Sequence, residues 1–249
     1  MYTTLKKRLR VERIINMNFL KKILHFSRFS SKQYLNELRK NGATIGEGTV
    51  VHYPMNVFID NTKPYMIKIG KNVQITKNVS ILTHDYSWSV LKGKYGEILG
   101  ACGKVEIGDN VFIGFNTTIL KDVKIGDNVI IGANSVVSRD IPSNCVACGS
   151  PAKMIMSIEE FYSKRKEAQL KEACMLINEY IKVNDKYPTE EDLREFVFLF
   201  KDRSHSSDKY VVDIFNLVGN SEETMDIFLN SSPLFSGLNE LIEYAQNNK

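Results

Sequence analysis

A histidine and the only tryptophan of this 249-residue chain lie close together in one segment. Residues 83–104 read THDYSWSVLKGKYGEILGACGK and contain both His84 and Trp88. An imidazole has an unperturbed pKa near neutrality, so it can take the proton of a hydroxyl group that attacks a carbonyl carbon. A histidine on its own can equally hydrogen-bond the base of a loop. His84 is therefore the candidate general base, and the elements that hold it decide between the two interpretations.

The sequence on both sides of this segment repeats every six residues. A period of six fits neither an α-helix nor an ordinary strand and is typical of hexapeptide β-solenoids. Residues 107–124 and 125–142 are identical at nine of eighteen positions, and eighteen residues make one coil of a three-sided prism. The aliphatic positions of the repeat are Ile45, Val51, Val57, Ile69, Ile75, Ile81, Ile107, Ile113, Ile119, Ile125, Ile131 and Val137.

Glycine often follows the aliphatic residue directly, and we expect these glycines to occupy the crowded corners where the chain bends. The period breaks between Ile81 and Ile107, so residues 83–104 are predicted to leave the prism as a loop. Stacked coils are convex and rigid, and a pocket has to form at such an excursion or at a junction between prisms. The loop is therefore the predicted position of the site.

Charge divides the chain into three zones. The whole chain has 33 Lys+Arg against 29 Asp+Glu, a formal charge of +4. Residues 1–40 carry +9, residues 41–156 carry +2 and residues 157–249 carry −7. With 43% hydrophobic and 25% charged residues, the composition excludes a disordered chain and a small disulfide scaffold. We expect a cytoplasmic protein with reduced cysteines and no nucleic-acid partner.

The first zone, residues 1–40, is predicted to be a basic helical segment. Leu20, Ile23 and Leu24 recur at helical spacing, and Met17 is an alternative start of translation. A second helix, capped by Ser31 and ended by Gly42, buries Tyr34, Leu35 and Leu38. Basic amphipathic helices either pack on the adjoining domain or make peripheral contact with an anionic membrane surface.

The third zone, residues 157–249, is predicted to be an acidic, all-helical C-terminal domain of three to five helices. A capping-box pattern at residues 157–160 begins the first helix, and Pro188 begins the second. Ser221 and the segment 237–246 indicate two more. No pattern in this zone indicates a chemistry.

The central zone, residues 41–156, resembles the left-handed β-helix hexapeptide-repeat acyltransferases. The resemblance rests on the hexads, the paired IGDNV coils, GANSVVSRDIP and the closing CGSPAK. Galactoside, maltose and xenobiotic O-acetyltransferases form the most similar branch. The resemblance implies a mainly β fold, a left-handed parallel β-helix flanked by short N-terminal helices and the C-terminal helices. It also implies a homotrimer with sites between subunits and acetyl-CoA as the acetyl donor.

Individual residues take their roles from this resemblance. The segment ILTHDYSW resembles the part of the family that bears the catalytic histidine, here His84. An acceptor-binding asparagine of the sugar O-acetyltransferases is matched near Asn56. Asp60, Asp85 and Trp88 are further acceptor candidates, because a ring can stack on a sugar and carboxylates accept hydroxyl hydrogen bonds; Asp85 could equally cap the loop turn. The donor candidates are Phe112 (where relatives often have Trp), Gly114, Ala133, Ser138, Arg139 and Lys153.

A metal site is not expected. A zinc site of the γ-carbonic-anhydrase type, built on the same fold, needs three histidines, and only His52 and His84 lie on the prism. The pair Cys145 and Cys148 has CxxC spacing but no second pair, so ordinary buried thiols are favoured.

Three functions stay open at this point. The leading hypothesis is acetyl transfer from acetyl-CoA to a hydroxyl of a sugar or surface-polysaccharide precursor, with His84 as the base and no acyl-enzyme. The first alternative is N-acetylation of an amino sugar, free or nucleotide-linked. The second is a non-catalytic trimeric scaffold whose helical domain binds a partner.

Overall fold

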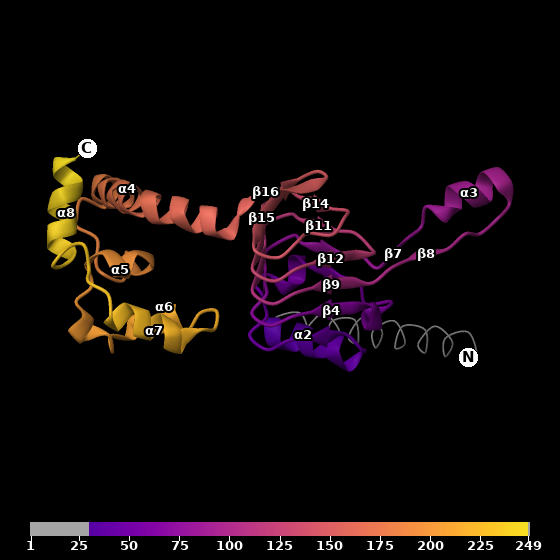
Figure 1. Cartoon of the computed structure of the whole chain (residues 1–249), viewed down its shortest axis with the longest axis horizontal. Helices are drawn as coiled ribbons and strands as arrows, with labels where there is room; N and C mark the ends of the chain where they lie inside the picture. The colour runs from indigo at the N-terminus through magenta and orange to yellow at the C-terminus, as the bar shows by residue number, and fades with distance from the viewer. Residues whose placement is uncertain (1–29, 249) are drawn as a thin grey trace, which may run out of the picture. The chain divides into compact units, whose positions relative to one another are not determined.

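The computed structural model describes residues 30–248 (Figure 1). The predicted first helix around Leu20, Ile23 and Leu24, together with His25, lies outside the described residues. The chain divides into two compact units, residues 1–158 and 159–249. No helix among residues 30–248 is long and apolar enough to cross a bilayer.

The first unit is a parallel β-helix, as predicted. Successive short strands go to three sheets in turn, so the chain coils around three faces. The first face holds β1 (Thr44–Ile45), β4 (Ile67–Ile69), β9 (Val105–Ile107) and β12 (Val123–Ile125). The second holds β2 (Val50–Val51), β5 (Gln74–Ile75), β10 (Val111–Ile113), β13 (Val129–Ile131), β15 (Cys145–Gly149) and the antiparallel β16 (Ala152–Ser157). The third holds β3 (Phe58–Ile59), β6 (Ser80–Ile81), β11 (Thr118–Ile119) and β14 (Val136–Val137).

All twelve predicted aliphatic positions are buried in one core, but one is out of register. Ile81 pairs with Ile59, whereas the six-residue count predicted Val57. The 3₁₀ turn η1 (Pro54–Asn56) enlarges this corner of the first coil, so Val57 takes the other inward position of its strand. A second turn, η2 (Pro64–Met66), enlarges the next corner.

The glycines after the aliphatic residues are crowded, as expected, but they do not supply the backbone angle of the bend. Their φ angles are not positive; instead, a Cβ on Gly70 would lie 2.5 Å from the carbonyl oxygen of Gly108 in the next coil. Glycine therefore permits close stacking of coils. The bend itself is made by asparagines such as Asn72 and Asn116, which have φ angles of 54° and 59°. Asparagine tolerates this left-handed region better than most residues do.

Helix α2 (Ser31–Lys40) is capped by Ser30, not Ser31, because the Ser30 Oγ accepts a hydrogen bond from the Gln33 amide at 3.2 Å. As predicted, its apolar residues Tyr34, Leu35 and Leu38 are buried, and they join the β-helix core. This helix therefore packs on the adjoining domain. Membrane contact stays a prediction for residues 1–29, which lie outside the described part of the chain.

The loop that interrupts the repeats is a hairpin that carries a helix. Strand β7 (His84–Asp85) pairs antiparallel with β8 (Ala101–Cys102), and α3 (Trp88–Tyr95) lies between them. Figure 1 shows this hairpin carrying α3 away from the stacked coils. None of the residues of α3 is buried, so only the base of the hairpin is held by the β-helix.

The second unit is helical. It contains α4 (Ile158–Asn184), α5 (Val197–Phe200), α6 (Lys209–Phe215), α7 (Ser221–Leu229) and α8 (Leu238–Asn247), with the 3₁₀ turns η3 (Arg194–Phe196) and η4 (Arg203–His205). The predicted helix start at Pro188 is wrong. There, Asp192 accepts hydrogen bonds from the amide and hydroxyl of Thr189, which closes a turn, and helical structure begins only at Arg194.

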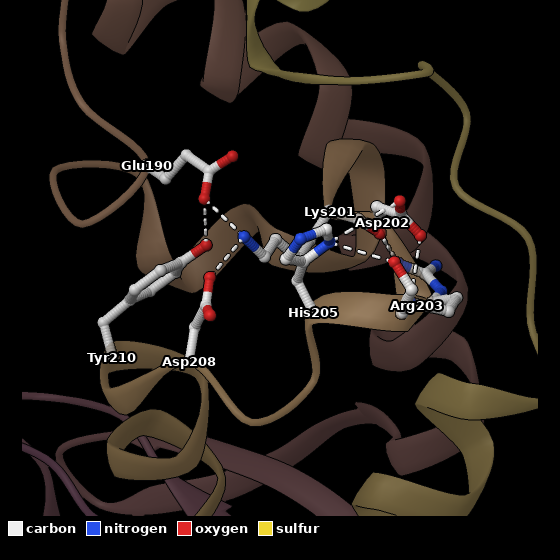
Figure 2. Close-up of polar contacts among 8 residues, drawn as sticks. Glu190, Lys201, Asp202, Arg203, His205, Asp208 and Tyr210 are labelled. Atoms are coloured by element: carbon white, nitrogen blue, oxygen red, sulfur yellow. Dashed lines mark hydrogen bonds and ion pairs between the residues drawn. The ribbon is translucent and has the colours of Figure 1, made fainter.

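A buried lysine holds the non-helical part of this unit together. The Nζ of Lys201 lies 2.6 Å from a carboxylate oxygen of Glu190 and 2.7 Å from one of Asp208, and the Tyr210 hydroxyl donates to the same Glu190 oxygen (Figure 2). Arg203 stacks over Phe228, at 4.1 Å from the ring centroid, and donates to backbone carbonyls. Among residues 30–248, the polar contacts of this cluster are all internal to the unit.

Candidate functional site

The base of the hairpin is fixed at the corner that follows the third face. The amide of Leu82 still donates to Ile119 of the next coil, at 3.0 Å, so the chain leaves the stack only after this residue. The Gly103 amide donates to the Thr83 carbonyl at 2.9 Å and closes the hairpin. His84 is therefore the first residue beyond a rigid anchor.

A buried carboxylate contacts His84. The Nδ1 atom of His84 lies 2.6 Å from an oxygen of Asp60, whose side chain is 1% exposed. The same oxygen accepts hydrogen bonds from the amide and hydroxyl of Thr83. The other oxygen accepts the amide and hydroxyl of Thr62, at 2.9 and 2.7 Å. This placement corrects the prediction that Asp60 binds the acceptor, because both of its oxygens are already occupied.

The hydrogen bonds keep Asp60 ionised and set the tautomer of His84. Burial alone would raise the pKa of Asp60, but the bonds from Thr83, Thr62 and His84 outweigh it and hold the pKa well below its usual range. A carboxylate only accepts hydrogen bonds, so Nδ1 of His84 carries a proton. In the neutral ring, Nε2 is then the lone-pair nitrogen, which is the arrangement that a general base requires.

His84 opens onto a cavity of about 440 Å³, a size within the range of small-molecule sites. The His84 side chain is 22% exposed. Three rings gather here: the Tyr86 centroid lies 5.7 Å from His84 and 5.8 Å from Trp88. The lining residues are Thr62, Lys63, His84, Asp85, Tyr86, Trp88, Gly100, Ala101 and Cys102.

Asp85 and Trp88, the other acceptor candidates of this segment, both line the cavity, and Asp85 also has local partners. Its carboxylate accepts the amide and hydroxyl of Ser87, at 2.9 and 2.5 Å, and lies 3.4 Å from the Nζ of Lys121. The Ser87 hydrogen bonds, followed by Lys121, lower the pKa of Asp85. The turn-capping role that was considered for Asp85 is therefore present in the structure.

The other predicted site residues lie at two different corners of the third face. Asn56, Gly114 and Ala133 precede its strands β3, β11 and β14, at the corner that leads in from the second face. Ser138 and Arg139 follow β14, at the same corner as Asp60 and His84. Asn56 and the donor candidates do not line the His84 cavity.

The remaining donor candidates lie on the second face. Phe112, in the middle of β10, is 42% exposed and is flanked in register by Gln74 and Ile130. Lys153 is exposed on β16, opposite Cys148. A Cβ on Gly114 would lie 2.6 Å from the amide nitrogen of Ala133, so close stacking alone already requires glycine at this position.

The other histidines and the cysteines of residues 30–248 form no cluster. His52 Nε2 contacts the Gln74 side chain at 3.0 Å, and His205 lies in η4 of the helical unit. Cys145 is buried, and burial raises the pKa of its thiol. Across residues 30–248, no three His, Cys, Asp or Glu side chains gather in a way that could hold a metal ion.

Sequence reasoning missed Thr62, Lys63, Thr83, Tyr86 and Cys102 as parts of the site. A signal for the Asp60–His84 contact was present, because Asp60 directly follows Ile59, the residue that pairs with Ile81. The two-residue shift at η1 concealed it. With the coils aligned on Ile59, the corner after the third face brings Asp60 next to the start of the hairpin.

Known proteins show the same repeat. Residues 104–139 match the family described as bacterial transferase hexapeptide (six repeats). The resemblance of this β-helix to the hexapeptide-repeat acyltransferases is thereby confirmed.

Two relatives align with less than half of the chain. Protein CapG of Staphylococcus aureus is 48% identical over 103 residues, 41% of this chain and 59% of CapG. YvoF of Bacillus subtilis (strain 168), whose name gives a provisional acetyltransferase designation, is 33% identical over 121 residues, 49% of this chain and 65% of YvoF. The chain thus spans about three fifths of the length of these relatives.

Solved structures are similar over about half of the chain. A maltose O-acetyltransferase from Clostridium difficile 630 is 28% identical, with 56% of this chain and 84% of that chain covered and a TM-score of 0.39. A hexapeptide-repeat acetyltransferase from Vibrio cholerae, complexed with acetyl coenzyme A, is 24% identical, with 53% and 80% covered and a TM-score of 0.42.

Proposed function

We propose that this protein transfers the acetyl group of acetyl-CoA to a hydroxyl of a sugar or a surface-polysaccharide precursor. The observation that carries the proposal is the contact between the buried Asp60 and the partly exposed His84, which lines the cavity. It combines an ionised, fully hydrogen-bonded carboxylate with an imidazole that still reaches solvent. The hexapeptide transferase match of residues 104–139 and the name of YvoF support acetyl transfer.

His84 acts as the general base in a direct transfer. Its Nε2 takes the proton of the acceptor hydroxyl as that oxygen attacks the thioester carbonyl, and a tetrahedral intermediate forms. The carbon–sulfur bond then breaks, and the imidazolium returns the proton to the departing sulfur, which leaves an acetyl ester and free CoA thiol. Asp60 touches neither substrate; it fixes the tautomer and stabilises the imidazolium, so it is a positioning residue.

The rings of the cavity favour a sugar as acceptor. Trp88 and Tyr86 offer apolar ring faces beside His84, and pyranose rings present an apolar face of their own. Asp85 accepts hydroxyl hydrogen bonds at the same wall.

The donor is proposed to lie along the upper coils, between subunits of a homotrimer. Ala133 and Gly114 let the CoA arm approach the backbone closely, with Phe112 as an apolar wall, while Ser138, Arg139 and Lys153 contact polar and phosphate groups. A trimer is favoured because Gly114 and Ala133 lie at the opposite corner of the third face from His84. A cyclic assembly, in which each interface joins two different surfaces, can bring one corner of a subunit against the other corner of its neighbour.

A thiol-release assay with acetyl-CoA tests the proposal across a panel of sugars, amino sugars, nucleotide sugars and oligosaccharides. We expect the His84→Gln variant to lose about 10³-fold in kcat. The matched control is His52→Gln, which changes the other histidine of the β-helix and should leave turnover unchanged. Near-wild-type turnover by His84→Gln would contradict the mechanism, and substantial activity of this variant at high pH on amino sugars alone would favour N-acetylation.

Two further measurements separate the remaining alternatives. Labelled acetyl-CoA without acceptor should leave no label on the denatured protein, because the transfer is direct. Calorimetry should detect CoA binding; if none occurs, the non-catalytic scaffold is favoured.

Subunit mixing tests the location of the site. We expect His84→Gln and Ala133→Trp to be inactive alone and to recover activity when they are mixed and reassembled, because some interfaces then combine two intact corners. Continued inactivity of the mixture, with trimers verified by sedimentation, would place the site within one chain.

A further inference from the structure

One cation of the cavity has no partner among the described residues. Lys63 lines the same cavity as His84, and its side chain is only partly exposed. Within residues 30–248 its ammonium group makes no ion pair and no hydrogen bond, whereas Lys121 at the same corner pairs with Asp85. Both carboxylates near the site already have partners, since Asp60 holds His84 and Asp85 is held by Ser87 and Lys121.

The backbone around Lys63 is fixed in place. The preceding residue, Thr62, donates both its amide and its hydroxyl to Asp60. The carbonyl of Lys63 accepts the amide of Met66 at 2.9 Å, which begins the turn η2. The hydrogen bonds that orient His84 therefore also fix the base of the Lys63 side chain, and a substrate that contacts both groups meets a preformed arrangement.

We propose that the acceptor is an anionic sugar whose carboxylate or phosphate binds Lys63 while one of its hydroxyls faces His84. This inference rests on the proposed acetyl transfer and adds the charge of the substrate to it. The ring of the sugar stacks on Trp88 and Tyr86, which line the cavity with Lys63 and His84. An unpaired ammonium at a partly enclosed wall attracts an anion more strongly than a fully hydrated one does.

Carboxylates and phosphates share this chemistry, so the test uses matched sugars of both kinds. Galactose is compared with galacturonic acid, glucose with glucuronic acid, and N-acetylglucosamine with its 1-phosphate and its uridine-diphosphate derivative. For the full chain we expect kcat/KM to be about tenfold or more higher for at least one anionic sugar than for its neutral counterpart. The member that gains most identifies the anion as a sugar carboxylate, a sugar phosphate or a nucleotide diphosphate.

Three variants assign the preference to Lys63. Lys63→Ala should remove the difference between charged and neutral acceptors without changing the KM for acetyl-CoA, and Lys63→Arg should retain most of it. Lys71→Ala, which removes an exposed lysine that does not line the cavity, should behave as wild type. An equal loss on charged and neutral sugars, or a raised KM for acetyl-CoA in Lys63→Ala, would overturn the proposal.

Binding is also measured without catalysis. Trp88 is the only tryptophan of the chain and lines the cavity, so its fluorescence reports on sugars that enter. We expect anionic sugars to change its emission at concentrations about tenfold lower than neutral ones, and Lys63→Ala to remove this difference. If no sugar releases thiol but this charge dependence persists, acetyl transfer fails and the anion site stands. If thiol is released but neither assay depends on sugar charge, the anion site fails and acetyl transfer stands. Absence of both effects overturns both.

Discussion

The two units of this protein bury ionic groups in opposite ways. In the β-helix, Asp60 is buried and bonded to His84, which opens onto a cavity. In the helical unit, Lys201 is buried between Glu190 and Asp208, and both of these ion pairs lie within the unit. The first arrangement leaves a ring nitrogen for a substrate; the second pairs the buried ammonium with two carboxylates of its own unit. A buried charge is thus a functional signal only where one of its partners also faces an open space.

The units also differ in the interactions that hold them together. The β-helix is held by aliphatic residues and hydrogen bonds that recur from coil to coil, so a polar cluster is needed only where the period breaks. The segment from Glu190 to Tyr210 contains only short helical pieces, and the Lys201 cluster joins its parts. Four substitutions test this contrast, from the largest expected effect to the smallest.

The first substitution removes the charge beside His84. Asp60→Asn should lower kcat about 10³-fold, equivalent to about 4 kcal/mol of barrier, because the neutral amide no longer stabilises the imidazolium. The KM for acetyl-CoA should stay unchanged, since Asp60 is 1% exposed and does not line the cavity. Thiol release measured from pH 5 to 9 would check this. If the unfolding temperature of Asp60→Asn fell so far that the variant was largely unfolded in the assay, the loss of rate would instead indicate a structural role.

The second substitution tests how tightly the coils stack. Gly70→Ala should destabilise the β-helix by about 3 kcal/mol, because the new Cβ would meet the backbone of Gly108 and the side chain of Asp109. Gly93→Ala is the matched control, since a Cβ there has nothing within 4 Å. Hydrogen exchange followed by mass spectrometry can localise the effect. Equal protection in the two variants would contradict the steric role of these glycines.

The third substitution tests the ionic cluster of the helical unit. Lys201→Met should destabilise this unit by about 2 kcal/mol, less than a fully buried pair would lose, because Glu190 and Asp208 can partly reach water. Circular dichroism at 222 nm during urea unfolding would measure the change. Unaltered thiol release would show that the cluster is separate from the site.

The pH dependence of this unit should follow from the same contacts. Burial opposes ionisation of Glu190, but Lys201 and Tyr210 outweigh it and lower its pKa below 4.5; the hydrogen bond from Lys201 lowers the pKa of Asp208 below 3.8. Each of these pKa values is lower in the folded state than in the unfolded chain. The stabilisation is therefore complete at a pH above the unfolded pKa and is lost as the pH falls through the folded pKa. Between pH 6 and 2 the wild type should therefore lose more stability than Lys201→Met. If the free energy of unfolding fell equally with pH in the wild type and in Lys201→Met, the ion pairs of Lys201 would not be the cause.

The fourth and smallest effect concerns the corners. Asn116 has a φ of 59° and donates from its amide to Asn134 at 2.8 Å. Asn116→Ala should cost about 1 kcal/mol, because alanine is strained in this region, whereas Asn116→Gly should cost less. Thermal unfolding of both variants would compare them. If glycine proved the worse residue, the side-chain hydrogen bond rather than the backbone angle would dominate.

The sequence by itself determined the β-helix and the place of its interruption. A six-residue period is compatible with few structures, and each aliphatic residue must face the core for coils to stack, so Ile113 or Ile131 could be assigned as buried without coordinates. His84 could be identified as a candidate general base for a related reason, since it lies in a segment that leaves the period and is free to form a pocket. The helical unit has no comparable constraint, and the predicted helix start at Pro188 was wrong because a local Thr189–Asp192 turn competes with it.

Only the tertiary structure decided what His84 contacts. Asp60 lies 24 positions before His84, and two 3₁₀ turns enlarge the corners on either side of the strand that precedes it. A count of six residues per strand therefore aligned Val57, not Ile59, with Ile81. The pairing of Ile59 with Ile81 corrects the register and changes Asp60 from an acceptor ligand to the partner of the base. The proposed role of Lys63 also depends on the tertiary structure. In the sequence it is one cation among many, and it becomes a candidate anion site only because the fold brings it to the cavity of His84 without a partner of its own.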